Sequence, residues 1–110
     1  MTQAQVQNVI KEMVSRIVTK FDPDKVILFG SYARGTAGPD SDVDLLVVFR
    51  HLEDTRRKKA IDIRVALNGM GSPKDVVVRT PEDLEQEKKV AGTIGREVQK
   101  DGKVLYERPH

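Results

Sequence analysis

Two short apolar runs, residues 26–29 and residues 43–49 with Asp44 as the one charged residue, constrain the fold of this chain more than any other feature. Runs of this length without helical periodicity predict strands that are covered on both faces. The segment between them contains Gly35, Gly38 and Pro39, so we expect a loop there with room for one short helical turn. Because this connection is short, the two strands can be antiparallel neighbours.

Helical patterns lie on both sides of these runs. Residues 2–20 predict an amphipathic helix because apolar side chains recur there at steps of three and four. Thr2 and Gln5 have the spacing of a capping box at its start. A second helix is expected over residues 55–68, and a third is expected to have Pro81 as its first residue.

The remaining segments complete an α+β pattern. Valine-rich residues 75–79 predict a third strand, and residues 103–107 predict a short last strand at an edge of the sheet. Between them, Gly92 and Gly95 are expected to split or bend a helical stripe. The order of elements predicts a small α+β fold, a mixed sheet of about four strands with helices packed against it, as one domain over residues 1–110.

Composition excludes several classes of protein. The 110 residues are 38% hydrophobic and 33% charged, as in an ordinary globular domain, and the net charge of +2 suits an anionic small ligand. There is no cysteine, which rules out disulfides, thiolate metal sites and a cysteine nucleophile. No apolar run is long enough to span a membrane, and the N-terminus lacks the pattern of a signal peptide. We therefore expect a cytoplasmic protein.

Two carboxylates open the strongest predicted strand, although strand interiors disfavour aspartate. Alternate residues of a strand share a face, so Asp42 and Asp44 point the same way. Asp75 opens the third strand and would add a third carboxylate if that strand lies beside the second. Mg²⁺ prefers oxygen ligands and binds through one or two carboxylates together with water and substrate phosphates. The three aspartates are therefore candidate metal ligands.

Gly30 and Ser31 end the preceding strand and supply the other half of a candidate site. A glycine lets phosphate oxygens approach the backbone closely, and the serine hydroxyl adds a hydrogen-bond donor. If a short helix starts after Ser31, its free N–H groups favour an anion. A phosphate cradle beside metal carboxylates is the layout for metal-assisted attack on a nucleoside triphosphate, with two ions about 3.5–4 Å apart.

This arrangement resembles a known family. Gly30-Ser31, a ten-residue spacer and Asp42-Val43-Asp44 followed by an apolar run resemble the signature of the DNA polymerase beta-type nucleotidyltransferase superfamily. The short chain and Asp75 on a later strand resemble its smallest branch, the minimal nucleotidyltransferases (MNT). The resemblance implies that Asp42 and Asp44 bind Mg²⁺, and that Asp75 helps to bind the catalytic metal and activates the acceptor hydroxyl.

The same resemblance implies that Gly30 and Ser31 hold the β- and γ-phosphates. The reaction would be in-line transfer of a nucleoside monophosphate, AMP from ATP, with release of pyrophosphate. It further implies a helical HEPN protein as partner, with the chain acting as its antitoxin, in some members by AMPylation. The alternative is a non-catalytic binding module that keeps the fold and neutralises a partner by docking. A nucleic-acid acceptor is not expected, and a homo-oligomer stays open.

Three basic features are ambiguous. Arg34 lies close in sequence to the predicted triphosphate site and is a candidate phosphate ligand, or else a solvated loop residue. Arg79 would share the face of Asp75 and could neutralise carboxylates or contact phosphate, or lie on the surface. The basic run at residues 56–59 opens a helix, and it predicts either a solvated face or a contact for an acidic partner.

Overall fold

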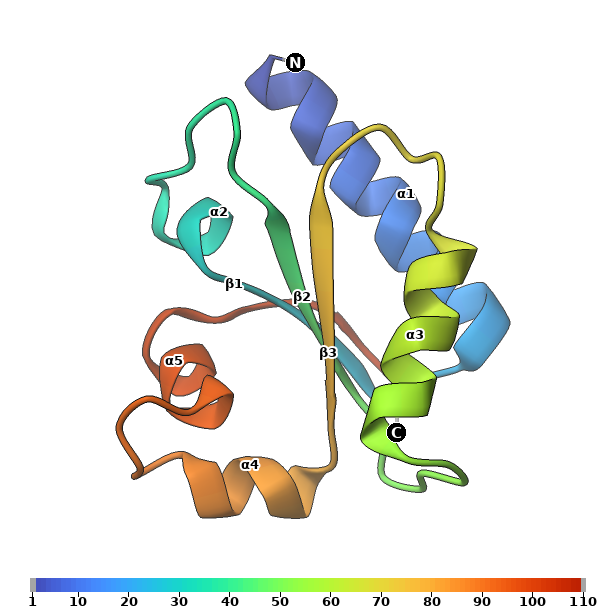
Figure 1. Cartoon of the computed structure of the whole chain (residues 1–110), viewed down its shortest axis with the longest axis vertical. Coiled ribbons are helices and arrows are strands. Elements are labelled where there is room, and N and C mark those ends of the chain that lie inside the picture. The colour runs from blue at the N-terminus through green and yellow to red at the C-terminus, as the bar shows by residue number, and fades with distance from the viewer. Residues whose placement is uncertain (1, 110) are drawn as a thin grey trace.

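The computed structural model describes residues 2–109 and is built on a four-stranded sheet in the order β3-β2-β1-β4 (Figure 1). Its strands are β1 (Lys25–Phe29), β2 (Val43–Val48), β3 (Lys74–Arg79) and β4 (Lys103–Glu107). Strand β1 pairs antiparallel with both β2 and β4, whereas β2 and β3 are parallel. The predicted mixed sheet, the antiparallel first pair and the last strand at an edge are all confirmed.

The helices are α1 (Gln3–Phe21), α2 (Ser31–Arg34), α3 (Arg56–Ala66), α4 (Pro81–Glu87) and α5 (Ile94–Asp101). The predicted capping box of Thr2 with Gln5 is present at the start of α1. The helical stripe after β3 does split, with α4 ending at Glu87 and α5 beginning at Ile94. Predicted boundaries of the longer elements differ from the observed ones by one or two residues, as fraying ends allow.

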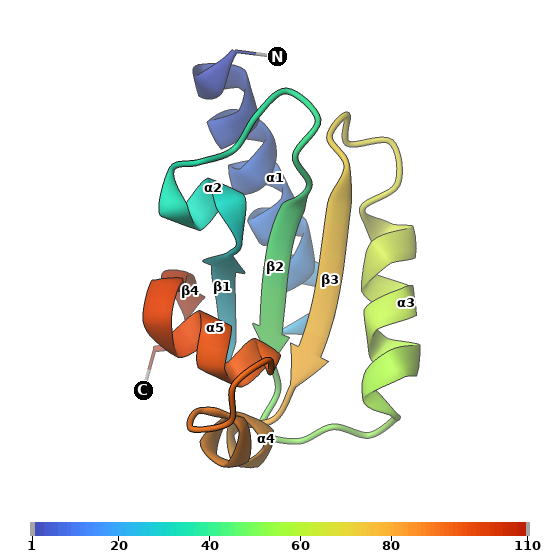
Figure 2. The same cartoon turned by 60° about the vertical axis from the view of Figure 1, so that its left-hand side comes forward.

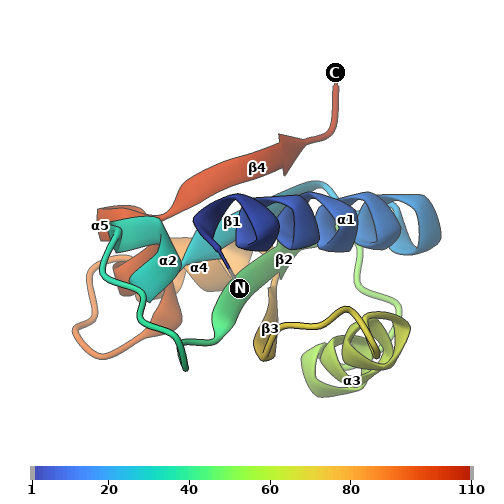
Figure 3. The same ribbon diagram turned by 90° about the horizontal axis from the view of Figure 1, so that it is seen from above.

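Two layers of helices cover the sheet. Seen from above, α1 and α3 lie on one face, and α4 and α5 lie on the other (Figure 3). Helices α1 and α3 bury Met13, Ile17 and Ile63 against one set of strand residues, which includes Leu45. The opposite face is smaller, with a core of four buried strand residues joined by partly buried side chains of α4 and α5.

Within residues 2–109, no helix is long and apolar enough to cross a membrane.

Candidate active site

The alternation of β2 decides where its aspartate lies. Val43, Leu45 and Val47 are buried toward α1 and α3, so Asp44 points to the other face together with Leu46 and Val48. Helices α4 and α5 lie toward the other end of β2 (Figure 2), and Asp44 is half-buried. Strand β2 is otherwise apolar, and it thus presents one carboxylate at the end of this face that lies away from α4 and α5.

The parallel pairing of β2 and β3 brings the second carboxylate to the first. Asp44 is the register partner of Asp75, so the two residues are direct neighbours on adjacent strands. Asp42 lies two residues before Asp44, just outside β2, and is exposed. The predicted condition for Asp75, that its strand lies beside the second strand, is therefore met. The three aspartates gather at the end of β2 and β3 nearest to α2 (Figure 2).

Gly30 joins the two halves of the candidate site. It precedes α2 with φ 74° and ψ −155°, a backbone region that is essentially open to glycine alone. A Cβ atom at this position would lie 2.1 Å from Oδ2 of Asp44. The sequence suggested that Gly30 makes room for phosphate; the structure adds that it makes room for the Asp44 carboxylate. Ser31 then begins α2, whose first N–H groups have no partner within the helix.

Burial and neighbouring negative charges both act on the Asp44 carboxyl. Burial raises the pKa of its carboxyl above the ordinary value of 3.8, and the negative charges of Asp75, Asp42 and Glu97 raise it further, in that order. Arg34 opposes the shift by lowering the pKa, but it does not outweigh the other causes. An excess of negative charge that neighbouring cations do not cancel is what a divalent cation would neutralise.

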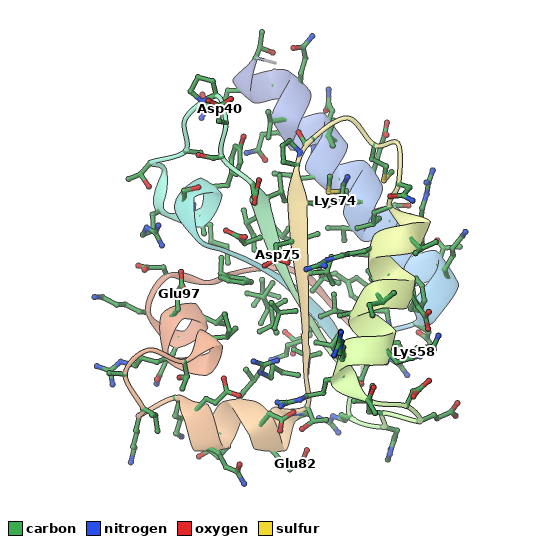
Figure 4. All side chains as sticks on the ribbon, in the orientation of Figure 1. Asp40, Lys58, Lys74, Asp75, Glu82 and Glu97 are labelled. Atoms are coloured by element: carbon green, nitrogen blue, oxygen red, sulfur yellow. The ribbon has the colours of Figure 1, made fainter. Side chains whose placement is uncertain are left out.

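Two ion pairs border the aspartates. Arg34 Nη1 lies 3.3 Å from Glu97 Oε1, which links α2 to α5, and Arg64 of α3 forms an ion pair with Asp75. Figure 4 labels Asp75 on β3 and Glu97 on α5. Sequence reasoning found neither Glu97 nor Arg64. The only available signal for Glu97 was its place beside Val98, one of the apolar residues that α5 turns toward the sheet.

Arg79 and three residues of the basic run form contacts with groups other than the three candidate aspartates. Arg79 Nε lies 3.0 Å from Glu87 Oε2, and its Nη1 donates a hydrogen bond of 3.0 Å to the Val78 carbonyl oxygen. In the basic run at residues 56–59, Arg56 contacts Asp83 and Glu87, and Lys58 contacts Asp62. Lys59 lies over the rings of Phe21 and Phe49. Much of this run therefore serves the fold, beyond forming a solvated face.

The donor set suits Mg²⁺, although its side chains are not closed around one point. Among residues 2–109, no three side chains of His, Cys, Asp or Glu are arranged as a metal site. Asp75 is engaged by Arg64 in an ion pair. Carboxylate oxygens are nevertheless the ligands that Mg²⁺ prefers, and the crowded charge at Asp44 favours a cation there.

Comparison with known proteins shows the family to which the chain belongs. The family description "Nucleotidyltransferase domain" matches residues 10–101. The chain belongs to this family. The nucleotidyltransferase predicted from Gly30, Ser31 and the aspartates is thereby confirmed as the class of enzyme.

Curated relatives come from Methanocaldococcus jannaschii. The protein named "Putative protein adenylyltransferase MJ0604" is 31% identical over 106 residues, which cover 91% of this chain and 97% of that protein. The protein named "Putative protein adenylyltransferase MJ1305" is 45% identical over 58 residues. That second match covers 51% of this chain and 40% of the relative, so the chain spans less than half the length of that protein.

Solved structures share the fold. A crystal structure described as "a putative nucleotidyltransferase from Sulfolobus solfataricus" superposes with a TM-score of 0.66 at 25% identity. The match covers 96% of this chain and 86% of that one. A toxin-antitoxin structure with AMP-PNP has a TM-score of 0.51 at 22% identity, covering 98% and 75%. A complex of tri-AMPylated Shewanella oneidensis HEPN toxin with MNT antitoxin has a TM-score of 0.50 at 21% identity, covering 94% and 73%. The nucleotidyltransferase fold is thus confirmed, and it is shared with a chain of a complex that contains an MNT antitoxin.

Proposed function

We propose that the chain transfers AMP from ATP to a hydroxyl group of a partner protein, with Mg²⁺ bound by Asp42, Asp44 and Asp75. The observation that carries the proposal is the placement of Asp44 opposite Asp75 on parallel strands, beside the glycine-lined start of α2. Family membership supports the class of reaction, and relatives named as protein adenylyltransferases support a protein acceptor.

Each side chain has a distinct task in this proposal. The backbone N–H groups at the start of α2 and the hydroxyl of Ser31 would hold the β- and γ-phosphates, with Arg34 at their margin. When bound, Mg²⁺ supplies charge neutralisation at the phosphates and at the attacking and leaving oxygens. Asp42 would hold the ion from the residue just before β2, and Asp44 from the second residue of that strand.

The transfer itself needs one proton acceptor. The acceptor hydroxyl oxygen forms a bond to the α-phosphorus while the bond between that phosphorus and the bridging oxygen breaks, and pyrophosphate leaves. The hydroxyl proton passes to the carboxylate of Asp75. In the chain as described, Arg64 occupies this carboxylate, so the hydroxyl would compete with the guanidinium for Asp75.

The proposed partner is a HEPN-type helical protein, with this chain as its antitoxin. The support is the fold shared with the MNT antitoxin in the Shewanella oneidensis complex.

The experiment is transfer of label from α-labelled ATP with Mg²⁺ to a HEPN protein that co-purifies with the chain. Label is expected on the partner with the wild-type chain and absent with Asp42→Asn or Asp44→Asn. Asp40→Asn changes the same charge in the exposed loop just before the site and should leave labelling intact. Equal labelling by Asp44→Asn and the wild type would overturn the proposed roles.

A non-catalytic docking module is the second candidate. The ion pairs of Arg34 with Glu97 and of Asp75 with Arg64 favour it, because they hold two candidate site residues in contacts within the chain. Under this alternative, Asp44→Asn still neutralises the partner although it transfers no label. Loss of neutralisation together with loss of label would support the enzyme.

A further inference from the structure

An ion pair beside the three aspartates joins two helices that are far apart in the sequence. Arg34 is the last residue of α2, and Glu97 lies in the first turn of α5. Figure 4 shows Glu97 on the side of α5 that faces α2. Arg34 Nη1 donates a hydrogen bond of 3.3 Å to Glu97 Oε1. The structure therefore fixes the Arg34 side chain through α5, an element that sequence reasoning did not connect with the site.

The place of Arg34 in α2 directs its side chain toward the candidate site. Helical side chains lean toward the N-terminus of their helix, and residues three apart share a face. Arg34 therefore shares a face with Ser31, and its N–H donates at 3.1 Å to the Gly30 carbonyl oxygen. Burial is the main cause of the raised pKa of Asp44, but Glu97 also raises that pKa and Arg34 lowers it. Both members of the ion pair thus act electrostatically on the site.

The contact with Glu97 uses only part of the Arg34 guanidinium. Arginine has five N–H donors in a planar fork, so it can bind one anion at one edge and a second anion at another. Within residues 2–109, Nη1 is the one nitrogen of Arg34 that donates to an acidic side chain. The Arg34 side chain is 41% exposed, so a ligand can reach its remaining donors.

Contacts that do not involve Arg34 fix the backbone that carries Glu97. Thr93 caps the start of α5 with its hydroxyl, and the Glu87 carboxylate accepts from the N–H of Gly95 at 2.9 Å. A Cβ atom at Gly95 would lie 2.5 Å from Cβ of Glu87, so the first turn of α5 packs closely against α4. Glu97 is therefore presented to α2 by a fixed helix end.

We propose that Glu97 is a positioning residue, which holds the Arg34 guanidinium toward the candidate triphosphate site so that its remaining donors meet the β- and γ-phosphates. The inference rests on the nucleotide site proposed above at Gly30 and Ser31, and it adds the residue that orients the arginine of that site. An arginine side chain has many rotamers, and fixing one of them before the nucleotide arrives lowers the entropic cost of binding.

The charge of Glu97 and its reach lead to opposite expectations. As a negative charge, Glu97 repels a triphosphate, so its neutralisation would tighten binding. As a positioning residue, Glu97 needs its full length, because a side chain one methylene shorter ends short of Arg34 Nη1. Glu97→Asp keeps the charge and an acidic residue in the first turn of α5 but shortens the reach. Glu97→Gln keeps the reach and an acceptor oxygen but removes the charge.

The probe is ATP with Mg²⁺, titrated by calorimetry into the full chain without a partner protein. Glu97→Asp should weaken ATP binding about threefold to fivefold, the upper part of the range for one exposed charge pair, and Glu97→Gln should recover most of this loss. Binding of AMP, which lacks the β- and γ-phosphates, should not respond to either substitution. Glu12→Asp, the same shortening at an exposed position of α1, is the matched control and should bind ATP as the wild type does.

A double-mutant cycle tests whether Glu97 acts through Arg34. Arg34→Gln should itself weaken ATP binding, and Glu97→Asp should add no further loss in that background. A contact that merely supports the fold would instead weaken binding equally in both backgrounds. An equal loss in both backgrounds, tighter ATP binding by Glu97→Gln, or equal ATP binding by Glu97→Asp and the wild type overturns the inference.

The outcomes also separate this inference from the proposed function. The expected pattern of ATP binding, without transfer of label to a partner by the wild type, supports the role of Glu97 and contradicts the protein-directed reaction. Transfer of label by Glu97→Asp with the KM for ATP and the kcat of the wild type supports the reaction and overturns the role of Glu97. A raised KM for ATP with an unchanged kcat supports both.

Discussion

Gly30 is the residue whose identity the backbone fixes most tightly. Its φ and ψ lie in a region that other residues occupy only at a cost of about 1–3 kcal/mol, and its missing Cβ leaves room for Asp44 Oδ2. Gly30→Ala should therefore lower the free energy of unfolding by about 1–3 kcal/mol through backbone strain alone. The added Cβ should also displace the Asp44 carboxylate. Urea unfolding measures the first effect, and Mg²⁺ titration measures the second.

Gly38→Ala is the matched control for that substitution. Gly38 has no positive φ, and a Cβ there would meet nothing within 4 Å. Its unfolding curve should overlay that of the wild type. If the two alanine variants unfold at the same urea concentration, the close approach of Gly30 to Asp44 is not a constraint on the fold.

Asp44 makes stability depend on pH in a direction that its raised pKa fixes. Because the folded state holds the proton more tightly than the unfolded state, the ionised carboxylate destabilises the fold above the raised pKa, and this cost vanishes below 3.8. Without Mg²⁺, Asp44→Asn should raise Tm at pH 7 by about 2–4 °C after allowance for solvent screening. The gain should disappear as the pH falls through the raised pKa.

Thermal unfolding of both proteins across this pH range measures the effect. Asp40→Asn, in the exposed loop before β2, supplies the control for loss of one negative charge. A gain from Asp44→Asn that is the same at every pH would show that shape, and not ionisation, explains the change.

Helices α4 and α5 are held to the rest of the domain through Glu87. Its carboxylate accepts from Arg79 of β3 and from the N–H of Gly95 in α5, and it lies 4.0 Å from Arg56 of α3. With 19% of the side chain exposed, these contacts are protected from water. Glu87→Ala should lower the free energy of unfolding by about 2–3 kcal/mol, because charge-assisted hydrogen bonds are lost and Arg79 is left unpaired.

Urea unfolding checks this prediction, and Glu85→Ala is its control. Glu85 lies on the same helix and pairs with Lys88, but its side chain is 71% exposed. Its loss should leave the unfolding midpoint unchanged, since water replaces such a contact. Equal midpoints for the two variants would mean that Glu87 does not organise these helices.

The elements that the sequence predicted well are those with a strong local signal. Strand β2 follows from an apolar run that only Asp44 interrupts, the cap of α1 follows from a short motif, and the start of α4 follows from Pro81. The split between α4 and α5 followed from glycines, and Gly92 does take a positive φ. Contacts such as Arg34 with Glu97 have no local signal, because only the packing of α5 against the sheet brings these two side chains together.

For the molecule as a whole, parallel pairing of β2 and β3 is the decisive feature. Local patterns predict both strands, but a parallel neighbour requires the intervening crossover through α3, so register cannot be read from either strand alone. The Asp42 and Asp44 pair was therefore predictable as a unit, whereas the contribution of Asp75 was conditional on topology. Its ion pair with Arg64 was not predictable, since it depends on how α3 packs beside β3.

Mg²⁺ binding should couple this site to the stability of the entire fold. Three aspartates at the end of the sheet repel one another when the chain folds without metal, and a bound cation converts that repulsion into attraction. A ligand that binds only the folded state stabilises it by mass action, about 1.4 kcal/mol at tenfold excess over Kd. The wild-type Tm should rise by several degrees with Mg²⁺, whereas that of Asp42→Asn should barely change.

The comparison with Asp40→Asn makes this test specific to the site. That variant loses the same charge two residues earlier in the chain and should keep the full response to Mg²⁺. If Mg²⁺ raises the Tm of Asp42→Asn as much as that of the wild type, the ion acts elsewhere or by general screening. A response confined to chains with both Asp42 and Asp44 ties stability to the carboxylates themselves, because no other change separates these variants.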